Sequence, residues 1–192
     1  MIGFDEVTVD DAERILKWRV SHRVTKYMNT DVEFNIDNQR RWLVNSYSKD
    51  SYYHWIIKSE NRPVGLIYLS DFDFANKVTS WGFYIGEDDC VGLGAFIPPY
   101  FYNFLFLTVG LERIDAQVFY SNLSVLGLHK LHGYKFAPAK DQVIEKNGSE
   151  ILLVAMSLSS EDWIANKRFR KQVAEFPIGN WKANPIGGVK EA

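Results

Sequence analysis

The chain has 192 residues, of which 46% are hydrophobic, and its 22 Lys and Arg side chains nearly balance its 24 Asp and Glu side chains. This length and composition are typical of a soluble globular protein whose core needs no disulfide or metal support. The balanced charge provides no basic surface for nucleic acid or anionic lipid, and one cysteine with four histidines gives no recognisable metal-ligand spacing. We therefore expect no nucleic acid, no membrane and no metal as partners, and a cytoplasmic location.

The N-terminal quarter of the chain predicts a strand followed by helices. Residues 2–8 have the pattern of a strand, and apolar residues at helical spacing predict a helix that begins near Thr8 or Asp10. A short helical turn is expected over residues 23–28. Asn35 is placed to cap a second helix. The residues expected on the inner face of that helix are Trp42 and Leu43.

The remainder of the chain predicts mainly strands, with two helices between them. One helix is expected to begin near Pro98, because proline is tolerated only in the first turn, and the other covers residues 122–132 and ends at Gly133. The dipeptide Asn147-Gly148 is a strong hairpin signal. The resulting order, β-α-α-β-β-β-α-β-α-β-β, predicts an α/β fold with a mixed sheet. The expected strands cover residues 52–58, 63–69, 78–85, 113–119, 135–146 and 150–158.

Two glycines between the 78–85 strand and the next helix indicate a possible anion site. Gly92 and Gly94 allow backbone N–H groups to approach an anion closely, and the following helix adds the positive end of its dipole. The same spacing also occurs in ordinary tight turns. Ile97 takes the place of the third glycine of a dinucleotide fingerprint, and the lysine of a Walker loop is missing. The motif alone leaves both interpretations open.

A second group of polar residues lies at the start of the 122–132 helix. Asn122 and Ser124 occupy positions where capping side chains are common. His129 follows Asn122 by seven residues, about two turns, so the two side chains lie on the same side of the helix. A catalytic histidine and a structural one both fit this pattern.

The loop with Gly92 and Gly94, followed later in the chain by the 122–132 helix, resembles the GNAT superfamily of N-acetyltransferases, which bind acetyl-coenzyme A. In that family a loop written Arg/Gln-x-x-Gly-x-Gly/Ala holds the coenzyme pyrophosphate. Gly92 and Gly94 match its two small positions, whereas Asp89 stands where Arg or Gln is usual. The helix that opens at Asn122 and ends in Gly133-Tyr134 matches the next family signature. The resemblance covers residues 2–158, most of the chain.

The resemblance implies a central, mostly antiparallel twisted sheet with splayed strands, flanked by helices. It implies one domain over residues 1–160, a partly irregular extension over 161–192, and acetyl-CoA as co-substrate. Backbone N–H groups near residues 83–85 would polarise the thioester carbonyl. His129 stands where the family has its general acid, with Tyr134 as second choice, and the general base is unassigned. The residues implied to bind the coenzyme are Phe83, Tyr84, Ile85, Val91, Gly92, Leu93, Gly94, Ala95, Asn122 and Ser124.

A closer resemblance is to bacterial amino-sugar N-acetyltransferases of the pseudaminic-acid type, whose substrate is a nucleotide-linked 4-amino-4,6-dideoxy sugar. It rests on Trp18-Arg19, Met28, Trp42, the run from Trp81 to Tyr84, and the 122–133 segment. On the acceptor side we expect Arg19 to bind the nucleotide diphosphate or the sugar, because a guanidinium matches phosphate geometry, and an ion pair at the helix end is the alternative. The other candidates for the acceptor pocket are Tyr84, Trp18 and Trp81, and packing in the core is the alternative for the two tryptophans.

Other acceptors also fit the sequence, because relatives of the same outline acetylate protein N-termini or polyamines. An aminoglycoside acceptor and a catalytically silent acyl-CoA-binding domain are further alternatives, and the resemblance allows a homodimer. Aromatic residues form 15% of the chain. We expect most of them in the core around the 98–111 helix and a few beside the acceptor.

Overall fold

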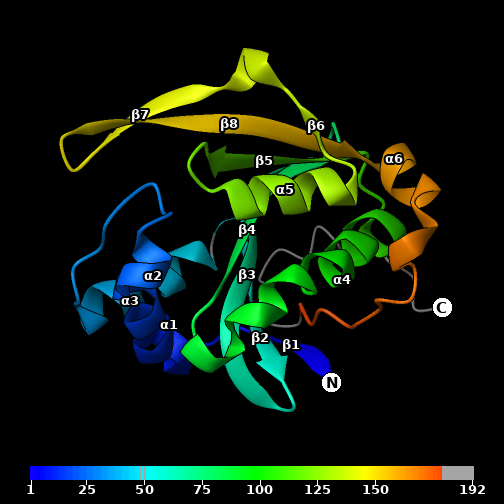
Figure 1. Ribbon diagram of the computed structural model, residues 1–192. Coiled ribbons are helices and arrows are strands. Elements are labelled where there is room, and N and C mark those ends of the chain that lie inside the picture. The colour runs from blue at the N-terminus through cyan, green and yellow to red at the C-terminus, as the bar shows by residue number, and fades with distance from the viewer. Residues whose placement is uncertain (48, 50, 179–192) are drawn as a thin grey trace.

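The computed structural model describes residues 1–47, 49 and 51–178, and it is built on one eight-stranded mixed sheet with helices on both faces (Figure 1). The strands follow the order β1-β2-β3-β4-β5-β8-β6, and β7 pairs with the remaining length of β8. Every pairing is antiparallel except that of β4 with β5. The strands are β1 (Ile2–Glu6), β2 (Tyr53–Ser59), β3 (Arg62–Asp73), β4 (Val78–Ile85), β5 (Arg113–Phe119), β6 (Lys135–Phe136), β7 (Gln142–Lys146) and β8 (Ser149–Ser159).

Helices α1 to α3 cover one face of the sheet, and α4 and α5 cover the other (Figure 1). The α-helices are α1 (Ala12–Val20), α2 (His22–Thr25), α3 (Ile36–Ser46), α4 (Pro98–Asn103), α5 (Leu123–His132) and α6 (Ser160–Ala165). A π-helical segment, Phe104–Val109, continues α4. Short 3₁₀ helices cover Val9–Asp11, Asp88–Ala95, Pro138–Lys140 and Lys167–Phe169. No single helix of the described chain is long and apolar enough to cross a membrane. The helices Asp88–Ala95 and Pro98–Val109 are long and apolar enough only when they are counted together, and the chain bends between them.

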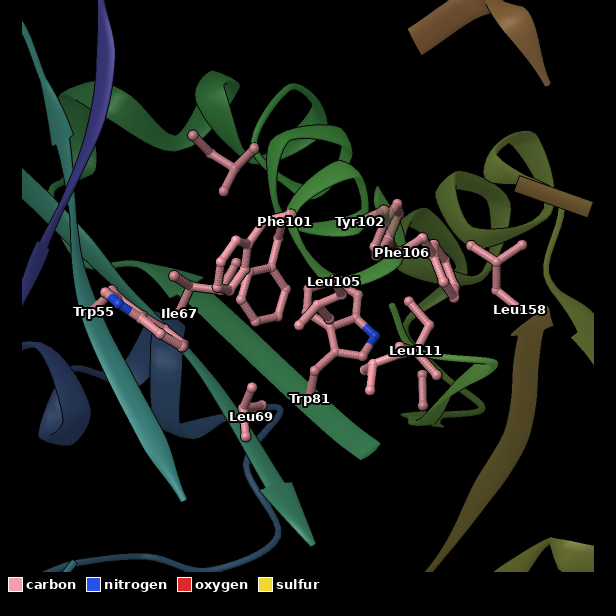
Figure 2. Close-up of a cluster of buried hydrophobic side chains, with 14 of the residues drawn as sticks. Trp55, Ile67, Leu69, Trp81, Phe101, Tyr102, Leu105, Phe106, Leu111 and Leu158 are labelled. Atoms are coloured by element: carbon pink, nitrogen blue, oxygen red, sulfur yellow. The ribbon is translucent and has the colours of Figure 1, made fainter. Parts of the chain in front are cut away.

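Each face of the sheet carries its own apolar layer, because side chains alternate along a strand. On β4, Trp81 and Ile85 belong to the layer under α4, whereas Tyr84 belongs to the layer under α1. Figure 2 shows the larger layer, in which the Trp81 indole lies among side chains of α4 and the π-helical segment. The aromatic surplus is therefore largely a feature of this core.

The two parallel strands separate after a short contact. Pairing of β4 with β5 begins at Val78 and Arg113 and ends at Ser80 and Asp115. Beyond this point the two strands share no register, although both continue for several residues. The predicted splay in a mostly antiparallel sheet is thus confirmed, and it leaves an opening in the middle of the sheet.

Several local predictions are confirmed at residue level. The predicted strands 78–85 and 113–119 have the observed bounds of β4 and β5, and α4 begins at Pro98. The Asn35 side chain caps α3 by accepting a hydrogen bond of 3.0 Å from the Asn38 N–H. Asn147 and Gly148 both have positive φ, 52° and 73°, as a two-residue hairpin turn requires.

Other predictions are wrong or only partly right. Trp42 does not point inward: 45% of it is exposed, whereas the neighbouring Leu43 is fully buried. The strand predicted over 135–146 is divided into β6 and β7, because a 3₁₀ turn at Pro138–Lys140 interrupts it. Helix α6 was not anticipated. The extension expected over 161–192 begins within α6 and includes the 3₁₀ helix Lys167–Phe169, and its residues 179–192 lie outside the described residues.

Candidate active site

A cavity of about 1370 Å³ lies where β4 and β5 separate. All residues of β4 from Ser80 to Ile85 and of β5 from Asp115 to Phe119 line it, so it reaches both faces of the sheet. We call the part under α5, which includes His129 and Asn122, the α5 side. We call the part under α1, which includes Arg19, the α1 side.

The edge of β4 that faces the cavity keeps unused backbone donors. The Gly86 N–H donates to the Val64 carbonyl oxygen over 2.7 Å. Backbone groups of every second residue point to the same side of an antiparallel strand, so every second residue of β4 counted back from Gly86 bonds to β3. The N–H groups of Phe83 and Ile85 therefore face the opening, whereas Tyr84 turns its backbone towards β3. Arg23 Nη1 donates to the Ile85 carbonyl oxygen over 2.7 Å, so that acceptor is already occupied. Two of the three predicted backbone donors are thus placed at the opening.

The predicted glycine loop is a 3₁₀ helix, Asp88–Ala95. The N–H groups of Phe96 and Ile97 donate to the Leu93 carbonyl oxygen over 2.8 and 3.2 Å, so they are not available to a ligand. An added Cβ at Gly92 would meet no atom within 4 Å, and at Gly94 it would make only ordinary contacts with Phe83 and Ile85. Neither glycine has positive φ. The fold itself therefore does not require glycine at either place.

The residues beside these glycines are unequally placed. Val91 and Gly94 line the central cavity, whereas Gly92 and Leu93 line a separate hollow of about 740 Å³. Ala95 is exposed and lines neither space. These five positions therefore do not form one continuous surface in this structure.

Asp89, the residue that departs from the family pattern, is paired with Arg62 at the start of β3. Arg62 Nη2 lies 2.6 Å from Asp89 Oδ2 and donates to Cys90 Sγ over 2.8 Å. The bond from Arg62 lowers the pKa of the Asp89 carboxyl. Arg62 thus places a guanidinium beside Gly92 in the smaller hollow. Sequence reasoning missed this cation, because 27 residues separate it from its partner.

Helix α5 carries its predicted polar residues to different places. The Asn122 side chain accepts a bond of 3.4 Å from the Val125 N–H as a cap and also lines the cavity, whereas Ser124 is exposed outside it. His129 lines the cavity but is only 3% exposed, and its Nδ1 has no hydrogen-bond partner within the described residues. Burial lowers the pKa of His129 to about 3, so the imidazole is neutral near pH 7.

Tyr134, the second choice for a proton donor, is a core residue. Its hydroxyl accepts a bond of 2.7 Å from Trp81 Nε1, and it lies outside the walls of the cavity. Burial raises the pKa of the Tyr134 phenol well above its usual value. Trp81 reaches the cavity wall from the same buried layer, so its indole lies on the α5 side, not beside Arg19.

Trp18 does not line the cavity. Its ring covers Gly86, where an added Cβ would lie only 2.1 Å from Trp18 Cγ, and its Nε1 donates to Glu87 Oε1 over 2.8 Å. Trp18 therefore fixes the end of β4 against α1, and its predicted position in an acceptor pocket is not supported by this geometry.

Arg19 and Tyr84 do lie together on the α1 side. Arg19 is partly buried and bonds the Thr25 hydroxyl and the Thr30 carbonyl oxygen, at 3.3 and 2.5 Å. It makes no ion pair with any described residue, and burial lowers the pKa of its guanidinium. Tyr84 is only 9% exposed, and it lines the cavity. The α1 side therefore contains a cation that forms no ion pair with a described residue.

Further aromatic residues of the α1 side were not identified as acceptor-site residues from the sequence. His54 and Tyr68 are register partners on β2 and β3 with stacked rings, and Trp42 meets His54 edge-on with ring centroids 5.0 Å apart. All three residues line the cavity. His54 and Tyr68 lie on the same face of the sheet because of the register between β2 and β3, and this register cannot be read from the sequence. Residues 27–35 of the loop between α2 and α3 supply much of the remaining wall.

A mostly antiparallel sheet, whose single parallel pair opens over a cavity with unused backbone donors, defines the acyl-CoA N-acyltransferase class of fold. The profile of the family described as "Acetyltransferase (GNAT) domain" matches residues 5–152. The chain belongs to this family and is an N-acetyltransferase, and the family implies acetyl-CoA as co-substrate. No curated protein sequence matches it significantly.

Solved structures of spermidine N-acetyltransferase from Vibrio cholerae share this fold. The enzyme in complex with CoA and spermine has a TM-score of 0.77 at 12% identity, over 85% of this chain and 98% of that one. Its complex with manganese ions has a TM-score of 0.71 at 13% identity, over 87% of this chain and 97% of that one. Identity this low establishes the shared fold alone.

Proposed function

We propose that the enzyme transfers the acetyl group of acetyl-CoA to the primary amine of a small molecule, with the coenzyme on the α5 side and the amine on the α1 side. The opening between β4 and β5 carries this proposal, because it joins the two sides through the sheet. Bound acetyl-CoA supplies the activated thioester. The protein must position the amine, polarise the thioester carbonyl and provide a proton for the departing thiol.

The open edge of β4 fits the coenzyme. The N–H groups of Phe83 and Ile85 point into the opening, where they can donate to carbonyl oxygens of an extended ligand. A backbone donor fixed where negative charge develops contributes about 10²–10³ in rate. Gly92 leaves open space next to Arg62, and an added Cβ would fill part of it. Both features are compatible with a phosphate-bearing coenzyme.

His129 is our proposed proton donor. Its imidazole is neutral near pH 7, so the ring takes up the proton that the amine loses as the amide bond forms and passes it to the departing thiolate. Negative charge that develops on a nearby sulfur favours the protonated imidazole and so raises the pKa of His129 during the reaction. The burial that makes the free residue a poor base therefore strengthens its interaction with a developing thiolate.

For the acceptor, we propose a nucleotide-linked amino sugar, as in the pseudaminic-acid-type enzymes that the sequence resembles. Arg19 supports this choice. A partly buried guanidinium that makes no ion pair is costly unless a ligand brings negative charge close to it. A diphosphate matches the donors of Arg19 bidentately, and the Tyr84 hydroxyl offers another polar contact nearby.

A polyamine is the second candidate. The Vibrio cholerae spermidine N-acetyltransferase with the same fold has been solved with CoA and spermine. Glu33 and Asp71 line the cavity as exposed carboxylates and make no ion pair with described residues. Asp115 also lines it, but Lys140 and Arg113 both lie 3.0 Å from its carboxylate oxygens. The carboxylates of Glu33 and Asp71 favour a cationic substrate such as a polyamine, whereas the positive charge of Arg19 disfavours a cationic substrate.

Thiol release from acetyl-CoA distinguishes these acceptors. The assay compares a UDP-linked 4-amino-4,6-dideoxy sugar with spermine, an aminoglycoside and a peptide amine at equal concentration. The highest kcat/KM for the UDP-linked sugar supports the main proposal, and the highest value for spermine replaces it with the second. Acetyl-CoA binding measured by calorimetry without turnover of any amine would instead support a silent binding domain.

A further inference from the structure

The α1-side wall of the cavity includes a segment that has little structure of its own. Residues 26–35 connect α2 to α3, and seven of them line the cavity: Tyr27, Met28, Asn29, Thr30, Val32, Glu33 and Asn35. The N–H groups of residues 29–34 form no hydrogen bond within the described chain. This wall segment is therefore held mainly by side chains that reach it from elsewhere.

The main contact comes from the tip of the β7–β8 hairpin. Lys146 Nζ donates to the carbonyl oxygens of Thr25 and Met28, at 2.6 and 2.7 Å, and lies 2.9 Å from Asp31 Oδ1. An ammonium group has three N–H donors, and these three acceptors use all of them. Only 9% of the Lys146 side chain is exposed. Such a buried, fully satisfied ammonium is a specific contact rather than a loose surface pair.

The neighbouring turn residue adds a second contact. Asn147 Nδ2 donates to Asp31 Oδ2 over 3.0 Å, while the Thr25 hydroxyl donates to Asp31 Oδ1 over 2.8 Å. Asp31 thus joins the hairpin tip to the end of α2. We call Lys146 and Asn147, with Thr25, Met28 and Asp31, the clasp. From inside the cavity Arg19 bonds Thr30, so the wall segment is held on both sides.

We propose that Lys146 is a positioning residue for the acceptor: the clasp fixes the wall segment that shapes the α1 side of the cavity. This inference rests on the proposed function, because it takes the α1 side as the acceptor side. Lys146 lies outside the cavity wall and so does not contact substrate itself. Its effect is transmitted through the backbone of Thr25 and Met28.

The first test measures the clasp without any turnover. Chymotrypsin cleaves after Tyr27 and Phe34, which lie in the wall segment. Lys146→Met keeps the length of the side chain but removes its charge and donors, and we expect it to increase cleavage there about tenfold or more. Lys135→Met is the matched control, because Lys135 pairs with Asp162 outside the cavity walls. Equal cleavage of Lys146→Met and wild type would overturn the proposal.

The second test measures steady-state kinetics of the same variants. We expect Lys146→Met to raise the KM for the acceptor about tenfold, with kcat and the acetyl-CoA Kd nearly unchanged. Lys146→Arg keeps the charge and should recover part of the loss. If Lys146→Met does not fold, Asp31→Asn and Asn147→Ala weaken the same clasp from either side. An equal rise in KM for both substrates would contradict a role specific to the acceptor.

The two tests separate this inference from the proposed function. If wild-type enzyme acetylates no amine, the proposed function fails, while the cleavage comparison still supports or overturns the clasp. Faster cleavage with an unchanged acceptor KM would overturn the positioning role of Lys146.

Discussion

The imidazole of His129 stacks on the phenol ring of Tyr134, with ring centroids 4.5 Å apart and ring planes 21° apart. Tyr134 is in turn held by the indole of Trp81, which donates to its hydroxyl. The His129 ring is therefore fixed from the core and borders the cavity at the same time. This arrangement gives the proposed donor a defined orientation without a hydrogen bond to its Nδ1.

His129→Phe tests this role while it keeps a flat ring on Tyr134. We expect kcat to fall at least about 100-fold, because general acid catalysis typically contributes 10²–10⁴, with little change in acetyl-CoA Kd measured by calorimetry. Because the pKa of His129 is lowered to about 3, kcat of the wild type should show no inflection near pH 6.5 from this residue. Retention of kcat by His129→Phe would remove His129 from the mechanism.

Three buried histidines make the stability of the protein sensitive to acid. Burial lowers the pKa of His54 and His129 to about 3 and that of His132 to about 4, from about 6.5 in an unfolded chain. Below pH 6.5 the unfolded chain binds more protons than the folded one. The free energy of unfolding is therefore highest above pH 6.5, and it decreases as the pH falls from 6.5 towards 4.

Urea unfolding at pH 7.5 and pH 5 measures this loss. Below pH 6.5, each histidine that stays neutral in the folded protein lowers the free energy of unfolding by about 1.4 kcal/mol per pH unit. Neither ring nitrogen of His132 has a hydrogen-bond partner in the described chain. His132→Leu should therefore reduce the loss between the two pH values, whereas His22→Gln, on the surface, should not. An unchanged pH dependence in His132→Leu would show that this histidine is not held neutral.

Two glycines provide a paired test of the coenzyme loop. Gly86→Ala places a methyl group inside the Trp18 ring and should destabilise the protein by about 1–3 kcal/mol, as overpacking does. Gly92→Ala meets open space, so its free energy of unfolding should change by less than about 0.5 kcal/mol. Its acetyl-CoA Kd, measured by calorimetry, should nevertheless rise. An unchanged Kd would mean that Gly92 does not approach the coenzyme.

Arg19→Met distinguishes the two acceptor classes. If Arg19 binds a diphosphate, the kcat/KM for the UDP-linked sugar should fall about tenfold or more, because a charge-assisted hydrogen bond is lost. The kcat/KM for spermine should stay the same or rise, since a repelling cation is removed. Arg14→Met on the same helix is the control, because Arg14 pairs with Asp11 outside the cavity. A larger loss with spermine would contradict the diphosphate role.

The sequence predicts the local parts of this fold better than its long-range contacts. Strands β4 and β5, the Asn35 cap and the Asn147-Gly148 turn follow from patterns within a few residues of chain. Trp42 was expected to be buried beside Leu43, but only Leu43 joins the apolar layer under α1, whereas Trp42 borders the cavity and meets His54 of β2.

The candidate site depends on long-range contacts, so less of it could be predicted. His129, Arg19 and Tyr84 line the cavity as expected, but Trp18 packs on Gly86 instead. Lys146 and Asp31 are 115 positions apart, and no local pattern links them. Their contact depends on how far the β7–β8 hairpin extends across the sheet.

Phe176 shows the same limit at the C-terminal end, where the resemblance implies only a partly irregular extension over 161–192. Its ring stacks on Phe4 and Phe104, with centroids 4.0 and 4.6 Å apart, and it is only 5% exposed. Phe176→Ala should therefore lower the free energy of unfolding in urea by about 3–5 kcal/mol. Val173→Ala, at a position 72% exposed, is the control and should have almost no effect. Equal stability of the two variants would mean that the segment after α6 does not support the core. A loss confined to Phe176→Ala, with acetyl-CoA affinity retained, would show that this segment stabilises the fold without forming the coenzyme site.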